Sequence, residues 1–195
     1  MNLRDKLPGL AKLSEIFLGF TSKRPLPKWR KDYFKNNELP NNLNKINNAI
    51  PVILFVDTFN RYYEPENVRS AINVLKKAGY YPFIPTLSNS SKILCCGRTY
   101  LSNGLMDNAK KEMLDILDAF RPYIKQGISV VGLEPSCILS FRDEIPNLIK
   151  TEETEYLKNN SYTFEELLIK KSKKIKFRSI NKKVLLHGHC HQKAF

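Results

Sequence analysis

Histidine and cysteine are scarce in this sequence, with only three histidines and four cysteines among 195 residues. Two cysteines are adjacent, Cys95 and Cys96, and all three histidines surround Cys190 in the segment His187-Gly-His-Cys-His191. Adjacent cysteines seldom form a disulfide with each other, because their Cβ atoms point apart. They can instead offer two thiolates to one metal ion or iron–sulfur cluster. The alternative interpretation is that they are small buried apolar side chains, as free cysteines often are.

Long apolar runs are also missing. No run approaches the roughly 20 residues that a helix needs to cross a bilayer, and residues 1–8 lack the apolar core of a secretory signal. We therefore expect a cytoplasmic protein with no membrane span. Peripheral association with a membrane is compatible with this expectation. Thiols stay reduced in the cytoplasm, so the cysteines favour a metal or redox site over disulfides.

Acidic residues are few, with 19 against 32 basic residues and a net charge of +13. Such a surplus makes nucleic-acid binding a function to consider. The basic residues form no known nucleic-acid readout motif, however, and we expect no nucleic-acid partner. The charge is interpreted mainly as a solvated surface, with docking to an acidic partner as the alternative.

Residues 1–48 are predicted to form a basic arm rich in proline and asparagine, since these residues favour turns over long elements. One short helix is predicted within it from four apolar residues at helical spacing: Leu10, Leu13, Ile16 and Phe17. We expect the arm to pack against something outside this chain. Residues 49–195 are predicted to form the folded domain.

Four short apolar runs in that domain predict strands, at residues 51–56, 81–85, 128–133 and 183–187. Pro82 places the second strand at a sheet edge. Helical patterns lie between the strands, at 65–78, at 103–125, from 134 onward, and after the capping box Thr163-Phe-Glu-Glu166. This alternation predicts an α/β fold, a parallel sheet with helices on both faces.

Functional loops of such a sheet lie at the carboxyl ends of its strands. Conspicuous residues follow each predicted strand, in the segments Thr58–Phe59, Cys95–Cys96, Glu134–Cys137 and Gly188–His191. The sequence therefore predicts one shared site. Its candidate metal ligands are Cys95, Cys96, Cys137, Cys190, His189 and His191, because thiolates and imidazoles suit zinc, and four thiolates suit zinc or an iron–sulfur cluster.

Glu134 has two interpretations, as a carboxylate ligand or as the cap of the following helix, and the cap is favoured. No glycine-rich phosphate loop occurs, and no spacing suggests a Ser/His/Asp arrangement. We therefore assign no catalytic or nucleotide-binding residue.

Several separated motifs resemble the cysteine-rich CCG domain, which occurs in heterodisulfide reductase and in the iron–sulfur component of glycolate oxidase. They are Phe55-Val-Asp-Thr-Phe59, Cys95-Cys-Gly-Arg98, Leu133-Glu-Pro-Ser-Cys137 and His187-Gly-His-Cys-His-Gln-Lys-Ala194. The chain looks most like the C-terminal part of FAD-linked oxidases of the D-lactate and D-2-hydroxyglutarate dehydrogenase type.

This resemblance implies electron transfer from a flavin, reduced by a D-2-hydroxy acid such as D-lactate, D-2-hydroxyglutarate or glycolate, through an iron–sulfur cluster to an acceptor. The implied partners are a flavin-containing dehydrogenase domain or subunit, which carries the FAD, and an electron acceptor. Since no flavin domain is found in this sequence, we do not expect the chain to be catalytic alone.

The chain departs from the family pattern, in which each of two repeats carries a lone Cys, a Cys-Cys-Gly and a Cys-x-x-Cys. Thr58 stands where the lone Cys is expected, and Glu134 replaces the first Cys of Cys-x-x-Cys. Cys190 would open a second repeat, so the resemblance implies the first half of a two-repeat domain. Zinc or a single iron held by three thiolates and a histidine is the alternative to a cluster. The alternative function is a zinc-stabilised interaction module without redox activity.

Overall fold

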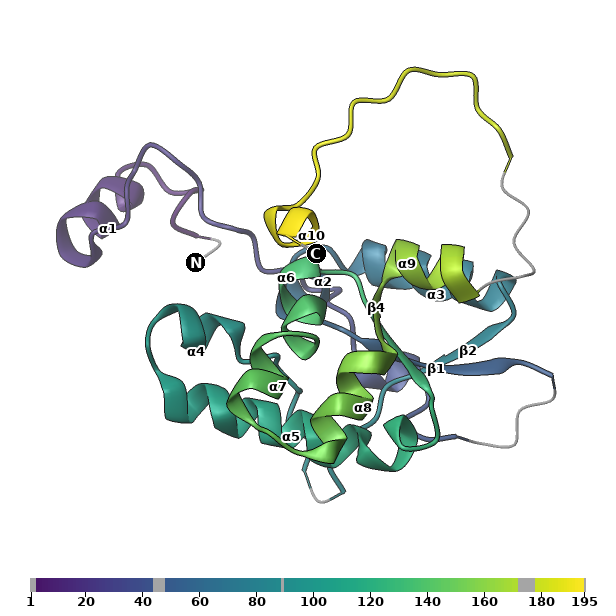
Figure 1. Cartoon of the computed structure of the whole chain (residues 1–195). Helices are drawn as coiled ribbons and strands as arrows, with labels where there is room; N and C mark the ends of the chain where they lie inside the picture. The colour runs from purple at the N-terminus through teal and green to yellow at the C-terminus, as the bar shows by residue number, and fades with distance from the viewer. Residues whose placement is uncertain (1–2, 44–47, 89, 172–177, 195) are drawn as a thin grey trace.

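A four-stranded parallel sheet forms the centre of the computed structural model, which describes residues 3–43, 48–88, 90–171 and 178–194 (Figure 1). The sheet order is β2-β1-β3-β4, and every neighbouring pair is parallel. The strands are β1 (Ile50–Phe55), β2 (Tyr80–Phe83), β3 (Ser129–Gly132) and β4 (Ser161–Thr163). The predicted α/β fold is confirmed, and β2 lies at an edge as Pro82 indicated.

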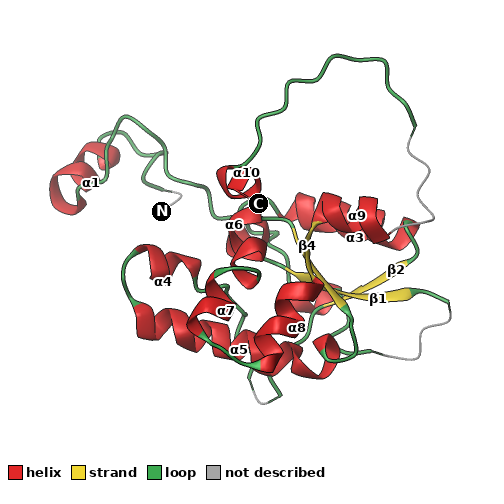
Figure 2. Cartoon of the chain, in the orientation of Figure 1, coloured by secondary structure: helices red, strands yellow, loops and turns green. Residues whose placement is uncertain are grey.

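Helices connect the strands and cover both faces of the sheet (Figure 2). The chain passes from β1 to β2 through α2 (Thr58–Tyr62) and α3 (Pro65–Lys77), and from β2 to β3 through α4 (Arg98–Ser102) and α5 (Met106–Ile124). It passes from β3 to β4 through α6 (Pro135–Ile138), η2 (Leu139–Phe141), α7 (Glu144–Leu148) and α8 (Glu152–Asn160). Beyond β4 follow α9 (Phe164–Lys171) and α10 (Cys190–Ala194).

Alternate side chains of β1 point into two separate hydrophobic cores, which explains its continuous apolar sequence. Ile53 and Phe55 belong to the core that contains the apolar residues of α5 and Leu157 of α8. Val52 and Leu54 belong to the other core, with the apolar residues of α3 and α9. The central strand is therefore buried on both sides.

The direction in which successive strands are added to the sheet reverses at β1. From β1 the chain first moves to β2 on one side, and after α5 it returns to β3 on the other side of β1. The carboxyl ends of β1 and β3 thus lie at a topological switch point, where open α/β sheets form binding crevices.

The predicted strand at 183–187 is wrong. These residues have no strand assignment, and Val184, Leu185 and Leu186 are 84%, 98% and 88% exposed. The fourth place in the sheet belongs to β4, whose polar sequence Ser161-Tyr-Thr163 gave no strand signal. Its buried hydroxyl groups have local partners, since Ser161 Oγ donates to the Leu157 carbonyl at 2.7 Å. An apolar run alone does not decide which segment pairs with the sheet.

The predicted capping box at the start of α9 is confirmed. The Thr163 backbone amide donates to Glu166 Oε2 at 3.0 Å, and the Glu166 amide donates to Thr163 Oγ1 at 3.4 Å. The helix expected at 103–125 is α5, and Gly104, which has a φ of 73°, separates it from the preceding short helix α4.

The N-terminal arm contains the expected short helix, α1 (Leu10–Leu18), and a 3-10 turn, η1 (Asn36–Glu38). Figure 1 shows α1 standing apart from the sheet and its helices. Phe34 and Leu39 are buried in the same core as α3, so the later part of the arm packs on the domain. The division of the chain at residue 48 stays a prediction. Among the described residues, no helix has both the length and the apolar character required to span a membrane.

Candidate functional site

A pocket of about 110 Å³ lies at the carboxyl edge of the sheet. The loop after β1 contributes Asp57, Thr58 and Phe59. The loop after β2 contributes residues 95, 96, 98 and 99, and α6 after β3 contributes residues 136 and 137. The predicted convergence of these three loops is therefore observed.

Two cysteine thiols are in contact in the wall of this pocket. The Cys96 and Cys137 sulfur atoms are 3.1 Å apart, and the residues are only 4% and 8% exposed. Cys95, which is half-buried, lines the same pocket, and all three cysteines are free thiols. Two thiolates on one tetrahedral zinc ion are about 3.8 Å apart at normal bond lengths. The contact therefore places Cys96 and Cys137 within reach of a shared ion.

Gly97 fixes the position of the paired cysteines. Its φ of 77° favours glycine, and a Cβ at this position would meet the Ala109 carbonyl oxygen of α5 at 3.0 Å. The turn after Cys96 therefore presses closely on α5. This close approach holds the Cys95–Cys96 loop against the end of the sheet.

Cys95 and Cys96 favour their protonated, thiol form. A hydrogen bond with Cys96, followed by burial, raises the pKa of Cys95 well above its usual range. The contact with Cys137, together with burial, raises the pKa of Cys96 to about 12. Since a metal binds the thiolate, metal binding here would release protons.

Asp57 is a functional-site residue that the sequence reasoning missed. It is 2% exposed, and its carboxylate caps α2 by accepting hydrogen bonds from the Phe59 and Asn60 amides at 2.9 and 3.0 Å. Burial, the largest influence, raises its pKa, and the negative charge of Glu134 acts in the same direction. An aspartate just after a buried strand and before a helix is a typical N-cap signal.

Glu134 caps α6, as favoured from the sequence. Its Oε1 accepts hydrogen bonds from the Ser136 amide at 3.3 Å and the Ser136 hydroxyl at 2.6 Å. The same oxygen lies 3.6 Å from His189 Nε2. Glu134 thus links the cysteine-bearing helix to the histidine segment.

The histidine segment reaches the site through α10 rather than from the end of a strand. His191 Nε2 lies 2.8 Å from an Arg98 guanidinium nitrogen, and the His189 and His191 rings stack with centroids 5.1 Å apart. Burial, then the charge of Arg98, lowers the pKa of His191. Arg98 also forms an ion pair with Glu144. Cys190 is exposed and does not line the pocket.

The donor chemistry of the pocket suits zinc or iron, because three soft thiols share one wall. Within the described ranges, however, no group of three or more His, Cys, Asp or Glu side chains is arranged around one metal position. The pocket therefore brings the cysteines together without forming a finished coordination shell. The ligand roles of Cys95, Cys96, Cys137, Cys190, His189 and His191 stay predictions.

Curated proteins similar to this chain are dehydrogenases. It is 24% identical over 195 residues to a subunit of anaerobic glycerol-3-phosphate dehydrogenase of Escherichia coli (strain K12), with 98% of this chain and 48% of that protein covered. It is 25% identical over 114 residues to D-2-hydroxyglutarate dehydrogenase of the same strain, with 58% of this chain and 11% of that protein covered. The corresponding protein of Pantoea ananatis (strain AJ13355) is 24% identical over 107 residues, with 55% and 10% covered.

The chain spans about half the length of the glycerol-3-phosphate dehydrogenase subunit that it matches, and about a tenth of the D-2-hydroxyglutarate dehydrogenases. No protein-family model matches it. No solved structure matches it either. These similarities relate the chain to dehydrogenases and leave the CCG domain as a resemblance.

Proposed function

We propose that this chain is an electron-transfer part of a dehydrogenase assembly, with the cysteine pocket as its metal centre. The observation that carries the proposal is the contact between Cys96 and Cys137, at the end of a sheet where Cys95 lines the same pocket. The similarity to dehydrogenases, one of them named as a subunit, supports the same conclusion. The assembly would be an FAD-linked oxidoreductase acting on a D-2-hydroxy acid. Its FAD would belong to a partner domain or subunit, and its electrons would pass to a separate acceptor.

The residues that would hold the metal are Cys95, Cys96 and Cys137, with His189 or His191 as a further ligand. A bound iron centre would supply one-electron chemistry, whereas zinc would stabilise the site without a redox change. The surrounding residues provide an environment suited to either ion. Arg98 contributes positive charge beside the thiolates, and Phe55 and Phe59 contribute apolar walls that limit the access of water.

A zinc-stabilised interaction module is the second candidate. Only three cysteines line the pocket among the described residues, whereas iron–sulfur clusters are commonly held by four thiolates. Three cysteines and one histidine are a common zinc ligand set. The number of thiols in the pocket therefore favours this alternative, while the similarity to dehydrogenases favours electron transfer.

Metal analysis of the anaerobically purified chain tests the proposal. We expect a stoichiometric metal whose binding is lost in Cys96→Ser and in Cys137→Ser. Cys190→Ser tests the remaining predicted cysteine ligand; because Cys190 is exposed and outside the pocket, this variant should keep the metal, and loss of metal in it would make Cys190 a fourth thiolate ligand. Iron with a visible thiolate charge-transfer absorbance that bleaches on reduction would support electron transfer. Colourless zinc would favour the interaction module, and equal metal content in all three variants would refute a metal centre in this pocket.

A further inference from the structure

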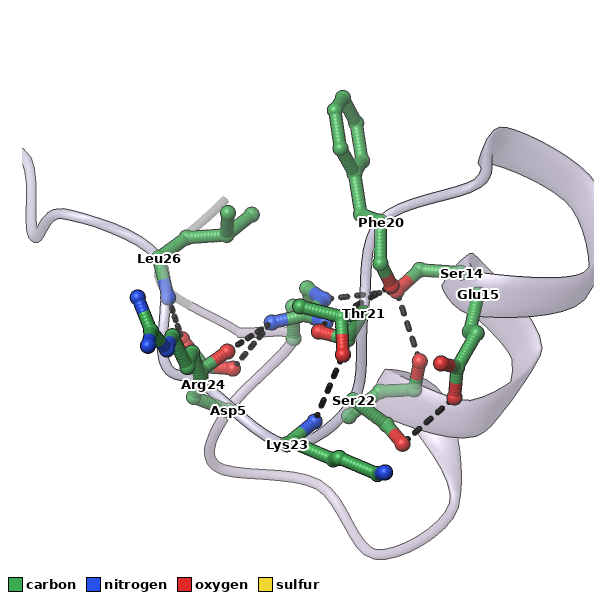
Figure 3. Close-up of polar contacts among 11 residues, drawn as sticks. Asp5, Ser14, Glu15, Phe20, Thr21, Ser22, Lys23, Arg24 and Leu26 are labelled. Atoms are coloured by element: carbon green, nitrogen blue, oxygen red, sulfur yellow. Dashed lines mark hydrogen bonds and ion pairs between the residues drawn. The ribbon is translucent and has the colours of Figure 1, made fainter.

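The first part of the N-terminal arm is held together by polar groups in its interior. We call residues 3–26 the N-terminal clasp. Arg4 is 6% exposed and donates to Ser14 Oγ at 2.6 Å and to the backbone carbonyls of Phe20, Thr21 and Arg24. Its guanidinium also pairs with Asp5 at 2.7 Å. Figure 3 shows these polar contacts gathered inside the clasp.

The clasp exposes several large apolar side chains to solvent. Ile16 and Phe17 are 76% and 75% exposed, and no residue of α1 is buried. Figure 3 shows the ring of Phe20 pointing away from the polar contacts. The other large apolar side chains that are exposed in this segment are Leu3, Leu7, Leu13 and Leu18. Exposed apolar side chains gathered in this way on one short segment are typical of an interaction surface rather than of a segment that faces water alone.

A basic pocket of about 470 Å³ adjoins this segment in the sequence. Lys6, Lys28 and Lys31 line it, together with Trp29, the only tryptophan of the chain. Asp5, also in the lining, is neutralised by Arg4. Within the described residues, the three lysines have no carboxylate at ion-pair distance, so their charge is directed to solvent.

We propose that the N-terminal clasp binds the surface of an anionic phospholipid bilayer. Its apolar side chains would enter the boundary between headgroups and acyl chains, and the three lysines would lie among the lipid phosphates. Peripheral helices with exposed aromatic and aliphatic residues beside basic ones bind in this way. A nucleic acid would satisfy the lysines but offers no apolar layer to Ile16 and Phe17. This inference is independent of electron transfer at the cysteine pocket.

Sedimentation of the full chain with lipid vesicles tests the inference. We expect the chain to bind vesicles of mixed phosphatidylcholine and phosphatidylglycerol, to bind phosphatidylcholine alone much more weakly, and to dissociate as salt is added. Because Trp29 lines the basic pocket, its fluorescence should shift to shorter wavelength and be protected from an aqueous quencher on binding.

Two pairs of substitutions separate the apolar and basic contributions. Ile16→Ser with Phe17→Ser should weaken partitioning at least about tenfold, since two exposed side chains no longer enter the membrane. Lys28→Gln with Lys31→Gln should weaken it about 30-fold at low salt. The matched controls are Ile169→Ser, a 75% exposed residue of α9, and Lys76→Gln with Lys77→Gln, at the end of α3. The controls should bind as the unmodified chain does.

Three results would overturn the inference. The first is failure of the unmodified chain to bind anionic vesicles. The second is vesicle binding that depends on Lys28 and Lys31 but not on Ile16 and Phe17, together with a Trp29 fluorescence change in inorganic phosphate or duplex DNA as large as the change with vesicles. That result would indicate a general polyanion site. The third is self-association that requires Ile16 and Phe17 without vesicle binding, measured by analytical ultracentrifugation, which would make a second copy of the chain the occupant.

Discussion

Replacing Gly132 by alanine should disturb the cysteine pocket without touching a cysteine. Gly132 ends β3 directly beneath α6, and a Cβ there would meet Ile138 Cβ at 2.8 Å and Cγ1 at 3.2 Å. Carbon atoms in contact normally lie about 3.5–4.0 Å apart, so α6 must move by about 1 Å. Because α6 carries Cys137, we expect the contact between Cys96 and Cys137 to be lost.

The stability effect of Gly132→Ala follows from two opposing contributions. Overpacking a core costs about 1–3 kcal/mol, and the alanine recovers about 0.4–1 kcal/mol by restricting the unfolded chain. We expect a net loss of about 1–2 kcal/mol in the free energy of unfolding, measured by urea unfolding followed by circular dichroism. The Cys137 thiol should also react faster with a thiol reagent.

The matched control is Gly188→Ala, where a Cβ would meet only the flexible Lys193 side chain, at 3.3 Å. This substitution should change stability by less than about 0.5 kcal/mol. A Gly132→Ala variant as stable as the unmodified chain, with unchanged thiol reactivity, would show that the packing of α6 on β3 does not position Cys137.

Three further substitutions test other parts of the site and its support. Asp57→Asn keeps a good N-cap but removes a buried charge. Because the folded-state pKa of Asp57 is raised, the unmodified chain should lose stability relative to this variant as pH rises from about 4. Parallel urea-unfolding pH profiles of the two proteins would contradict this. Glu166→Ala should lower the free energy of unfolding by about 1–2 kcal/mol, since it removes one side of the capping box of α9 and the partly buried pair with Arg142 at 2.8 Å. An unchanged urea midpoint would refute the capping role. Phe141→Ala should lower the free energy of unfolding by about 3–5 kcal/mol, because the buried ring packs edge-on against Phe55 with centroids 4.9 Å apart. A smaller loss in the same assay would mean that the surrounding core collapses into the space.

The sequence predicted the elements whose burial is strongest. β1 and β3 are β-branched runs buried on both faces, and the glycines that follow α3 and α5 mark where those helices end. The meeting of Cys95, Cys96 and Cys137 followed from the general rule that the carboxyl ends of parallel strands share one edge. Local patterns and topology were enough for this much of the site.

Other features depend on tertiary context that the sequence pattern does not contain. β4 is short and polar, and its place in the sheet is set by β3 rather than by its own hydrophobicity. The apolar run at Val184–Leu186 has the composition of a buried strand yet finds no partner in the described structure. The approach of His191 to Arg98 is a contact between segments far apart in the sequence.

The order of strands in the sheet also determines when the thiols can meet during folding. β1 pairs with β2 after a short crossover, but its pairing with β3 joins Val52 to Ser129 across most of the domain. Non-local parallel pairings of this kind form slowly. Until β3 pairs with β1, Cys95 and Cys96 are not in contact with Cys137. In that partly folded chain their thiols are without the burial that raises their pKa in the folded structure. We therefore expect newly made chains to be more sensitive to oxidation at these cysteines than folded ones.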